Sequence, residues 1–240
     1  MRFDVLTLFP EMLEAVLGNS IIGRARESGL VTLNFHNIRD YTADKHRRVD
    51  DYPYGGGSGM VMQAAPIYNA FMHLTEGLAD KPIVVYLSPQ GKPFTQTIAK
   101  EMLANKHYIL LCGHYEGVDE RILEKIVDIE ISLGDFVLTG GEIPAMAVID
   151  AVCRMVPGVL CDEAAFTEES HYNGLLEYPH YTRPADFMGQ LVPEILLNGH
   201  HANIEKWRHE QAMLRTQQKR PDMYEKVIQN ESGKKTSRKV

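Results

Sequence analysis

Residues 83–133, IVVYLSPQGKPFTQTIAKEMLANKHYILLCGHYEGVDERILEKIVDIEISL, decide the fold of this 240-residue chain. Apolar runs of strand length alternate here with helix-forming segments, in the order 83–87, 95–104, 108–112, 119–125 and 127–133. Strands that alternate with helices are typical of α/β proteins, whose parallel strands are buried on both faces. We therefore expect an α/β fold with a mostly parallel sheet.

The same alternation continues on both sides of this stretch. It predicts strands over 3–9 and 31–38, and helices from Pro10, from a cap at Ser20, over 66–78 and over 142–155. After Pro157 the pattern stops, and only helices are expected, over 191–197 and 204–218, with a disordered tail after Asn230. The expected organisation has an α/β domain, a flexible linker or lid, and a small C-terminal helical domain: 1–157, 158–172 and 173–240.

The composition is that of a globular protein, with 44% hydrophobic and 24% charged residues. No apolar run approaches the roughly 20 residues that a membrane-spanning helix needs, and the N-terminus resembles no targeting peptide. We therefore expect a cytoplasmic protein with no membrane association. The three cysteines, Cys112, Cys153 and Cys161, are too few for a disulfide framework or paired zinc sites, and are expected to be buried thiols.

Basic residues are concentrated in two places although the net charge is −7. From Lys206 onward the chain carries a net charge of +6, and Lys45-His46-Arg47-Arg48 forms a second basic group. Local basic patches on an acidic body suit a polyanion that contacts the protein at defined places, because phosphate attraction is screened beyond about 10 Å. Solvated surface is the other interpretation of these charges.

Familiar nucleotide and hydrolase motifs are missing. No G-x-G-x-x-G follows a strand, and Gly91-Lys92-Pro93 lacks the spacing of a phosphate-binding P-loop. Residues 56–60, GGSGM, approach the nucleophile elbow of serine hydrolases, but Met60 replaces its last glycine. A phosphate-binding or hydrolytic enzyme built on Gly55–Gly59 is therefore one alternative function.

Three predicted strands each end in a loop of glycine, proline or polar residues, at 86–91, 112–117 and 132–141. In α/β sheets, ligands bind beyond the carboxyl ends of the strands, where glycines let backbone groups approach a flat polar molecule. We expect these loops to converge on one pocket.

Several long motifs occur in a fixed order: YGGGSGMVM at 54–62, GHYEGVDER at 113–121, SLGDFVLTGGE at 132–142, PHYTRP at 179–184 and RPD at 220–222. Together they resemble the bacterial tRNA (guanine-N1)-methyltransferases, which modify the guanine 3′ of the anticodon. The resemblance extends from Met1 to about Tyr224. It implies the SPOUT class, with a deep trefoil knot in the parallel sheet, a homodimer with active sites shared between subunits, and S-adenosylmethionine as methyl donor.

The resemblance also implies which residues hold the donor in a bent conformation. They belong to the three loops and to the helix that follows the last of them: Tyr86, Leu87, Ser88, Pro89, Gly113, Tyr115, Glu116, Ser132, Leu133, Gly134, Asp135, Phe136, Val137, Leu138, Gly140, Gly141 and Pro144.

Methylation at guanine N1 needs a base that removes the N1 proton and a cation near O6. By matching motif, Arg154 is the family's arginine and Glu169 stands where the family has its catalytic aspartate. The extra methylene of Glu169 moves its oxygens by about a bond length, and such a shift can cost roughly 100-fold in rate. Glu168 is the alternative base. A non-catalytic RNA-binding module is the function expected if this change disables catalysis.

The target nucleotide must leave its stack to reach such a pocket. The resemblance places His46, Asp50, Gly59 and Ser170 on the side of the target base, with residues 158–172 closing over it as a lid. The helix that carries Lys206, Arg208 and Arg215 is expected to hold the RNA backbone. Mg²⁺ is a candidate cofactor because carboxylates and phosphates would gather there, but no ligand spacing identifies a metal site.

Overall fold

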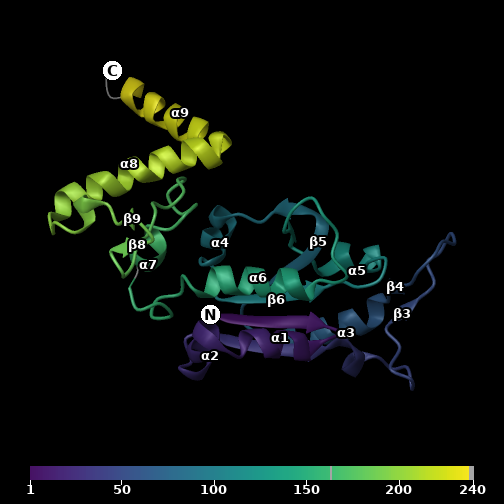
Figure 1. Ribbon diagram of the computed structural model, residues 1–240. Helices are drawn as coiled ribbons and strands as arrows, with labels where there is room; N and C mark the ends of the chain where they lie inside the picture. Colours follow the sequence, from purple (N-terminus) through teal and green to yellow (C-terminus); the bar gives the residue numbers. More distant parts are fainter. Residues whose placement is uncertain (163, 238–240) are drawn as a thin grey trace. The chain divides into compact units, whose positions relative to one another are not determined.

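The computed structural model describes residues 1–162 and 164–237, and the chain divides into two compact units, residues 1–163 and 164–240 (Figure 1). No helix among the described residues is long and apolar enough to cross a membrane.

The first unit is built on five strands that pair in parallel in the order β2-β1-β6-β5-β7. This arrangement confirms the expected α/β fold with a parallel central sheet. A separate antiparallel pair, β3-β4, follows the 3₁₀ helix η1. The elements are β1 (Arg2–Thr7), α1 (Pro10–Leu17), α2 (Ser20–Glu27), β2 (Thr32–Asn37), η1 (Ile38–Tyr41), β3 (Asp50–Asp51), β4 (Val61–Met62), α3 (Ala64–Thr75), β5 (Ile83–Pro93), α4 (Gln96–Met102), β6 (His107–Cys112), α5 (Glu120–Ile126), β7 (Ile129–Ser132) and α6 (Glu142–Cys153).

Helices cover both faces of the sheet, which explains why β1, β6 and the first half of β5 are mostly apolar and buried. On one face, α3 and α5 close a core that includes Leu6, Ile67, Ile109 and Ile122, all buried. On the other face α6 packs against β1, β6, α1 and α4. Side chains from alternate strand positions are buried on each side, as a parallel sheet between two helical layers requires.

Local capping signals explain most helix starts. Pro10 opens α1, where its missing N–H costs no hydrogen bond. The side chains of Thr95 and Asp119 accept hydrogen bonds from the first backbone N–H groups of α4 and α5. Ser20 was wrongly expected to cap α2. It is the first helical residue, Asn19 precedes it as the cap, and neither offers a side-chain cap.

Two of the three cysteine thiols are buried, as expected, and the third is exposed. Cys112 and Cys153 are buried, and burial raises the pKa of Cys153 to about 12, so that it stays a neutral thiol. Cys161 is exposed, which corrects the expectation that all three are buried. It lies beyond Gly158, where the chain has left the helix that packs on the sheet.

The second unit consists of α7 (Ala164–Thr167), the hairpin β8 (Asp186–Phe187) and β9 (Gln190–Leu191), the 3₁₀ helix η2 (Glu194–Leu196), α8 (His201–Lys219) and α9 (Pro221–Ser237). The expected helix over 191–197 is wrong, because this stretch is divided between a strand and a 3₁₀ turn on either side of Pro193. The expectation of no later strand is also wrong. Helix α9 continues to Ser237 where a disordered tail was expected, and residues 238–240 lie outside the described residues.

A buried carboxylate ties together the central strands of the first unit. Asp4 in β1 is 0% exposed, and four side chains from β1, β2 and β6 surround it. Its oxygens lie 2.7 Å from Arg2 Nε, 2.9 Å from Asn34 Nδ2, 2.8 Å from His36 Nε2 and 2.6 Å from His107 Nε2. Burial raises the pKa of Asp4, but these hydrogen bonds outweigh it and hold the pKa well below its usual value.

Asp4→Asn should destabilise the first unit by about 2 to 4 kcal/mol at neutral pH, because the charged acceptor of several hydrogen bonds is lost. A carboxyl with a depressed folded pKa stabilises the fold above its unfolded pKa, here 3.8, and stops doing so as the pH falls further. Urea unfolding should therefore show a smaller loss of stability between about pH 5 and pH 3 in the variant than in the parent chain.

The matched control is Asp222→Asn, which removes the carboxylate of the exposed Arg220–Asp222 pair. Exposed pairs contribute little, so this variant should unfold like the parent chain. Equal stability of the Asp4 variant and the control would contradict the role given to Asp4.

Candidate functional site

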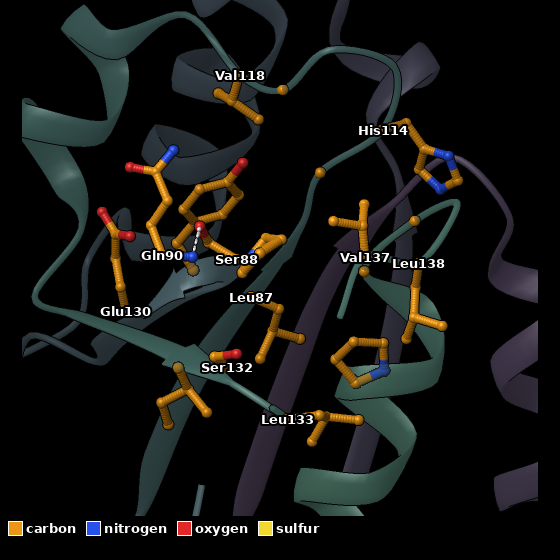
Figure 2. A pocket seen from close by; sticks show the side chains of 18 of the residues that line it. Leu87, Ser88, Gln90, His114, Val118, Glu130, Ser132, Leu133, Val137 and Leu138 are labelled. Atoms are coloured by element: carbon orange, nitrogen blue, oxygen red, sulfur yellow. Dashed lines mark hydrogen bonds between the residues drawn. The ribbon is translucent and has the colours of Figure 1, made fainter. Parts of the chain in front are cut away.

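An irregular part of β5, between Leu87 and Lys92, and the loops after β6 and β7 meet around one cavity of about 350 Å³ (Figure 2). The first of the three predicted loops therefore belongs to a bulged strand, because β5 resumes its pairing with β7 at Lys92. Gln90 and Glu130 lie on one side of it, and His114, Val137 and Leu138 on the other (Figure 2). Most of the residues expected to hold the donor line this cavity: Tyr86, Leu87, Ser88, Pro89, Gly113, Tyr115, Glu116, Ser132, Leu133, Phe136, Val137, Leu138, Gly140, Gly141 and Pro144.

Two expected residues, Gly134 and Asp135, belong to the same loop but do not line the cavity. The Ser132 hydroxyl bonds both backbone polar groups of Gly134, which keeps this turn closed on itself. The lining also contains residues that sequence reasoning missed: Gln90, His114, Gly117, Val118, Glu120, Leu123, Glu130, Ile131 and Thr139. These residues lie inside or next to the predicted loops and the quoted motifs, so their position in the sequence could have identified them as part of the lining.

The charge of the cavity limits what it can bind. Its described lining contains three carboxylates, from Glu116, Glu120 and Glu130, and no lysine or arginine. Such a wall favours a cationic ligand and disfavours a nucleoside di- or triphosphate. S-adenosylmethionine has a sulfonium, an ammonium and a flat adenine, and the apolar side chains of Leu87, Leu133 and the other loop residues suit the adenine. The carboxylates and apolar side chains of the cavity therefore fit this cofactor.

Tyr86 and Gly113 show how closely the loops pack. A Cβ added to Gly113 would lie 2.8 Å from the hydroxyl oxygen of Tyr86, so only glycine fits there. Burial, together with the charges of Glu130 and Glu120, raises the pKa of Tyr86 to about 12. Tyr86 is therefore a neutral hydroxyl in the wall of the cavity and not a base.

Behind the cavity lies a second buried carboxylate. Glu142, at the first turn of α6, is 1% exposed and accepts hydrogen bonds from Thr7 Oγ1 at 2.6 Å and from His114 Nε2 at 2.7 Å. Burial raises the pKa of Glu142, but the bonds from His114 and Thr7 outweigh it and hold the pKa below its usual value. An ionised Glu142 is also stabilised by the positive end of the helix.

The residues expected near the target base lie in part beside this cavity. A Cβ added to Gly59 would lie 2.5 Å from Glu116 Oε1, and Glu116 N donates to Met60 O at 3.0 Å, so the glycine-rich loop packs on the loop after β6. Burial and the nearby negative charge of Asp50 raise the pKa of Tyr115, and the positive charge of Arg39 opposes them.

His46 is exposed, and its backbone N–H donates to Asp44 Oδ1 at 2.7 Å. Ser58 lies in an exposed turn with Gly55, Gly56 and Gly57, and does not line the cavity. The structure therefore adds no support for a hydrolase centred on this loop.

The expected catalytic residues belong to different units. Arg154 caps the carboxyl end of α6 in the first unit. Glu168, Glu169 and Ser170 follow α7 in the second unit, where Ser170 Oγ accepts a hydrogen bond from Glu177 N at 3.0 Å. The described residues contain no group of three or more His, Cys, Asp or Glu side chains that could hold a metal ion.

The parallel sheet and the acidic, partly apolar cavity at its strand ends define an α/β protein with a pocket suited to a small cationic ligand. The family model for tRNA (guanine-1)-methyltransferase TrmD matches residues 1–226. The chain therefore belongs to the tRNA (guanine-1)-methyltransferase TrmD family.

Curated relatives agree with this assignment over nearly their whole length. A tRNA (guanine-N(1)-)-methyltransferase of Ruminiclostridium cellulolyticum is 62% identical over 227 residues, which cover 95% of this chain and 97% of the relative. A protein of the same name from Lachnospira eligens is 55% identical over 232 residues, which cover 97% and 98%. A third, from Clostridium beijerinckii, is 57% identical, with 95% and 93% covered.

Gly141→Ala should damage both the fold and the cavity, because the added Cβ would lie 2.6 Å from the backbone Cα of Cys112 in the central strand. Overpacking of this kind costs about 1 to 3 kcal/mol, and we expect a lower melting temperature together with weaker binding of S-adenosylhomocysteine. Thermal unfolding and titration calorimetry measure the two effects.

Gly55→Ala is the control, since its Cβ would meet no atom within 4 Å and only its positive φ of 88° causes strain. It should leave ligand binding unchanged. Normal binding by the Gly141 variant would contradict the close packing of these loops.

Proposed function

We propose that this protein transfers the methyl group of S-adenosylmethionine to N1 of the guanine 3′ of the anticodon in tRNA. The observation that carries the proposal is the cavity formed by the three strand-end loops, with carboxylates and apolar side chains but no lysine or arginine in its described lining. Membership of the family supports the same reaction, and the relatives named above carry it in their names.

The cofactor supplies an electrophilic methyl group on a positively charged sulfur. Leu87, Leu133 and Leu138 offer apolar contacts for its adenine, and the backbone groups of Leu133, Val137 and Leu138 offer hydrogen bonds to the ring edge. Carboxylates in the wall favour its positive charges, with Glu116 nearest the glycine-rich loop.

On the RNA side, we propose that Glu169 removes the N1 proton and that Arg154 stabilises the negative charge that develops on O6. Asp50 reads the N–H edge of the guanine, and its charge acts on Tyr115, which lines the cofactor cavity. His46, Gly59 and Ser170 complete the surroundings of the base. Glu168 is the alternative base if the longer side chain of Glu169 misplaces its oxygens.

The second unit is proposed as the tRNA-binding helical domain. Helix α8 carries Lys206, Arg208 and Arg215, and the net charge from Lys206 onward is +6, which suits RNA phosphates. Residues 158–172 would close over the target base as a lid. We assign Mg²⁺ no site of its own among the described residues, because a metal ion there would depend on RNA phosphates to complete its ligands.

We further propose a cytoplasmic homodimer of the SPOUT class, with a trefoil knot in the sheet and active sites shared between subunits. Support for dimerisation comes from α1 and α6, which pack on one another and expose large apolar side chains. Met12 and Val16 of α1 are 40% and 56% exposed, and Ile143 of α6 is 48% exposed. Apolar side chains gathered on adjacent helices are typical of subunit interfaces.

Methyl transfer can be tested directly. The purified protein, given S-adenosylmethionine with a labelled methyl group and a tRNA transcript with guanine 3′ of the anticodon, should produce N1-methylguanine at that nucleotide and nowhere else. Arg154→Ala and Glu169→Ala should each lower kcat by about 100-fold or more, because a positioned base and a charge-stabilising group are lost. Binding of S-adenosylhomocysteine should change little.

Glu168→Ala is the matched control. If Glu169 is the base, Glu168→Ala keeps most of the activity. If Glu168 is the base, Glu168→Ala loses the activity and Glu169→Ala keeps most of it. Tight tRNA binding without any transfer would favour a non-catalytic RNA-binding module. Loss of cofactor binding in the Arg154 or Glu169 variant would contradict the roles proposed for these residues.

Val16→Glu tests the proposed dimer, because a charge buried in an apolar interface is costly. Light scattering should give about twice the chain mass of 27.1 kDa for the parent protein and the mass of one chain for the variant. Glu14→Gln, on the same helix but already polar and exposed, should remain dimeric. A monomeric parent protein would contradict the shared active site.

A further inference from the structure

One buried carboxylate connects three segments that are far apart in sequence. Thr7 is the last residue of β1, His114 follows β6, and Glu142 is the first residue of α6. Thr7 Oγ1 and His114 Nε2 lie 2.6 Å and 2.7 Å from the two different oxygens of Glu142, so each oxygen has its own partner. The chain of bonds continues to Phe9, whose backbone N–H donates to Thr7 Oγ1 at 2.9 Å.

The same chain controls the position of two loops of the cavity. A Cβ added to Gly140 would lie 2.2 Å from Cε1 of His114, so the imidazole lies directly against the Gly140 backbone. Gly141 N donates to Gly113 O at 3.0 Å beside this contact. His114 therefore holds the loop after β7 against the loop after β6, and its ring forms part of the cavity wall (Figure 2).

Thr7 and Glu142 do not line the cavity, although His114 does. Thr7 is 0% exposed and Glu142 1% exposed, so water cannot replace a lost partner without a change in packing. A buried ionised carboxylate that loses one of its hydrogen bonds is costly, and the arrangement with both partners in place is therefore strongly preferred. The orientation of the His114 ring depends on this arrangement.

We infer that Thr7, Glu142 and His114 form a positioning chain that fixes the two loops in the shape that binds the cofactor. His114 is a positioning residue here, and Thr7 acts on the ligand only through Glu142 and His114. The inference rests on the proposed function for the identity of the ligand. It adds that Thr7 and Glu142, which do not line the cavity, influence the affinity for the cofactor.

Thr7 offers the sharpest test because it does not touch the cavity. Thr7→Val keeps the size of the side chain and removes the hydroxyl, whereas Thr7→Ser keeps the hydroxyl and removes a methyl group. Titration calorimetry with S-adenosylhomocysteine should show a Kd about tenfold higher for Thr7→Val, and a Kd within about twofold of the parent protein for Thr7→Ser. Circular dichroism and thermal unfolding of the same samples establish that each variant is folded.

Kinetics separates positioning from a general loss of structure. With tRNA saturating, Thr7→Val should raise KM for S-adenosylmethionine while kcat at saturating cofactor stays within about twofold of the parent value. A merely destabilised protein would lose kcat and the fraction of active molecules together. Unchanged cofactor affinity in a folded Thr7→Val variant would overturn the inference.

If Thr7→Val does not fold, His114→Leu and His114→Gln carry the test. Glutamine keeps an N–H donor that can reach Glu142, so it should bind S-adenosylhomocysteine more tightly than leucine does, by about tenfold. His73→Leu, an exposed histidine on α3 away from the cavity, is the control for loss of an imidazole. Equal affinities for the leucine and glutamine variants would overturn the inference.

The parent protein distinguishes this inference from the proposed function. If it fails to bind S-adenosylhomocysteine, the proposed function is wrong. If it binds while Thr7→Val binds equally well, only the positioning chain is wrong.

Discussion

Burial of both faces of the parallel sheet is the constraint on which the rest of the first unit depends. Helices α3 and α5 cover one face, and α6 with α1 and α4 covers the other, so side chains along the strands must be apolar or fully hydrogen bonded. Two buried carboxylates, those of Asp4 and Glu142, each accept hydrogen bonds from the side chains around them. Ligand chemistry is therefore left to the ends of the strands, where backbone groups and loop side chains are accessible.

Close packing of the strand-end loops links stability to binding in this protein. The loops are held by positions where only glycine fits, and His114 lies against one of them with Glu142 behind it. A cavity built in this way has little freedom to adapt its shape, which favours preorganised binding of one ligand shape. The cost is that changes in the wall also affect the fold, as the approach of Gly141 to the central strand shows.

Charge is distributed so that two different partners can be bound by one chain of net charge −7. The cavity presents Glu116, Glu120 and Glu130 to a cationic cofactor, while the basic residues from Lys206 onward suit the phosphates of an RNA. The proposed chemical step also needs a carboxylate and an arginine. In that proposal the longer side chain of Glu169 has to place its oxygens at N1, because a shift of about 1 Å can lower the rate roughly 100-fold.

The sequence by itself determined the alternation of strands and helices, because apolar runs and capping residues act locally, and it located the three loops whose glycines and prolines follow the strands. Two predictions from local patterns were wrong. Residues 191–197 are divided by Pro193 and form no helix, and Cys161 is exposed because it lies beyond the end of the packed helix α6. Only the tertiary structure decided that Thr7 and Glu142, 135 residues apart, share a hydrogen bond behind the cavity. No local pattern encodes such a contact, since it exists only after β1, β6 and α6 have packed together and water has been excluded.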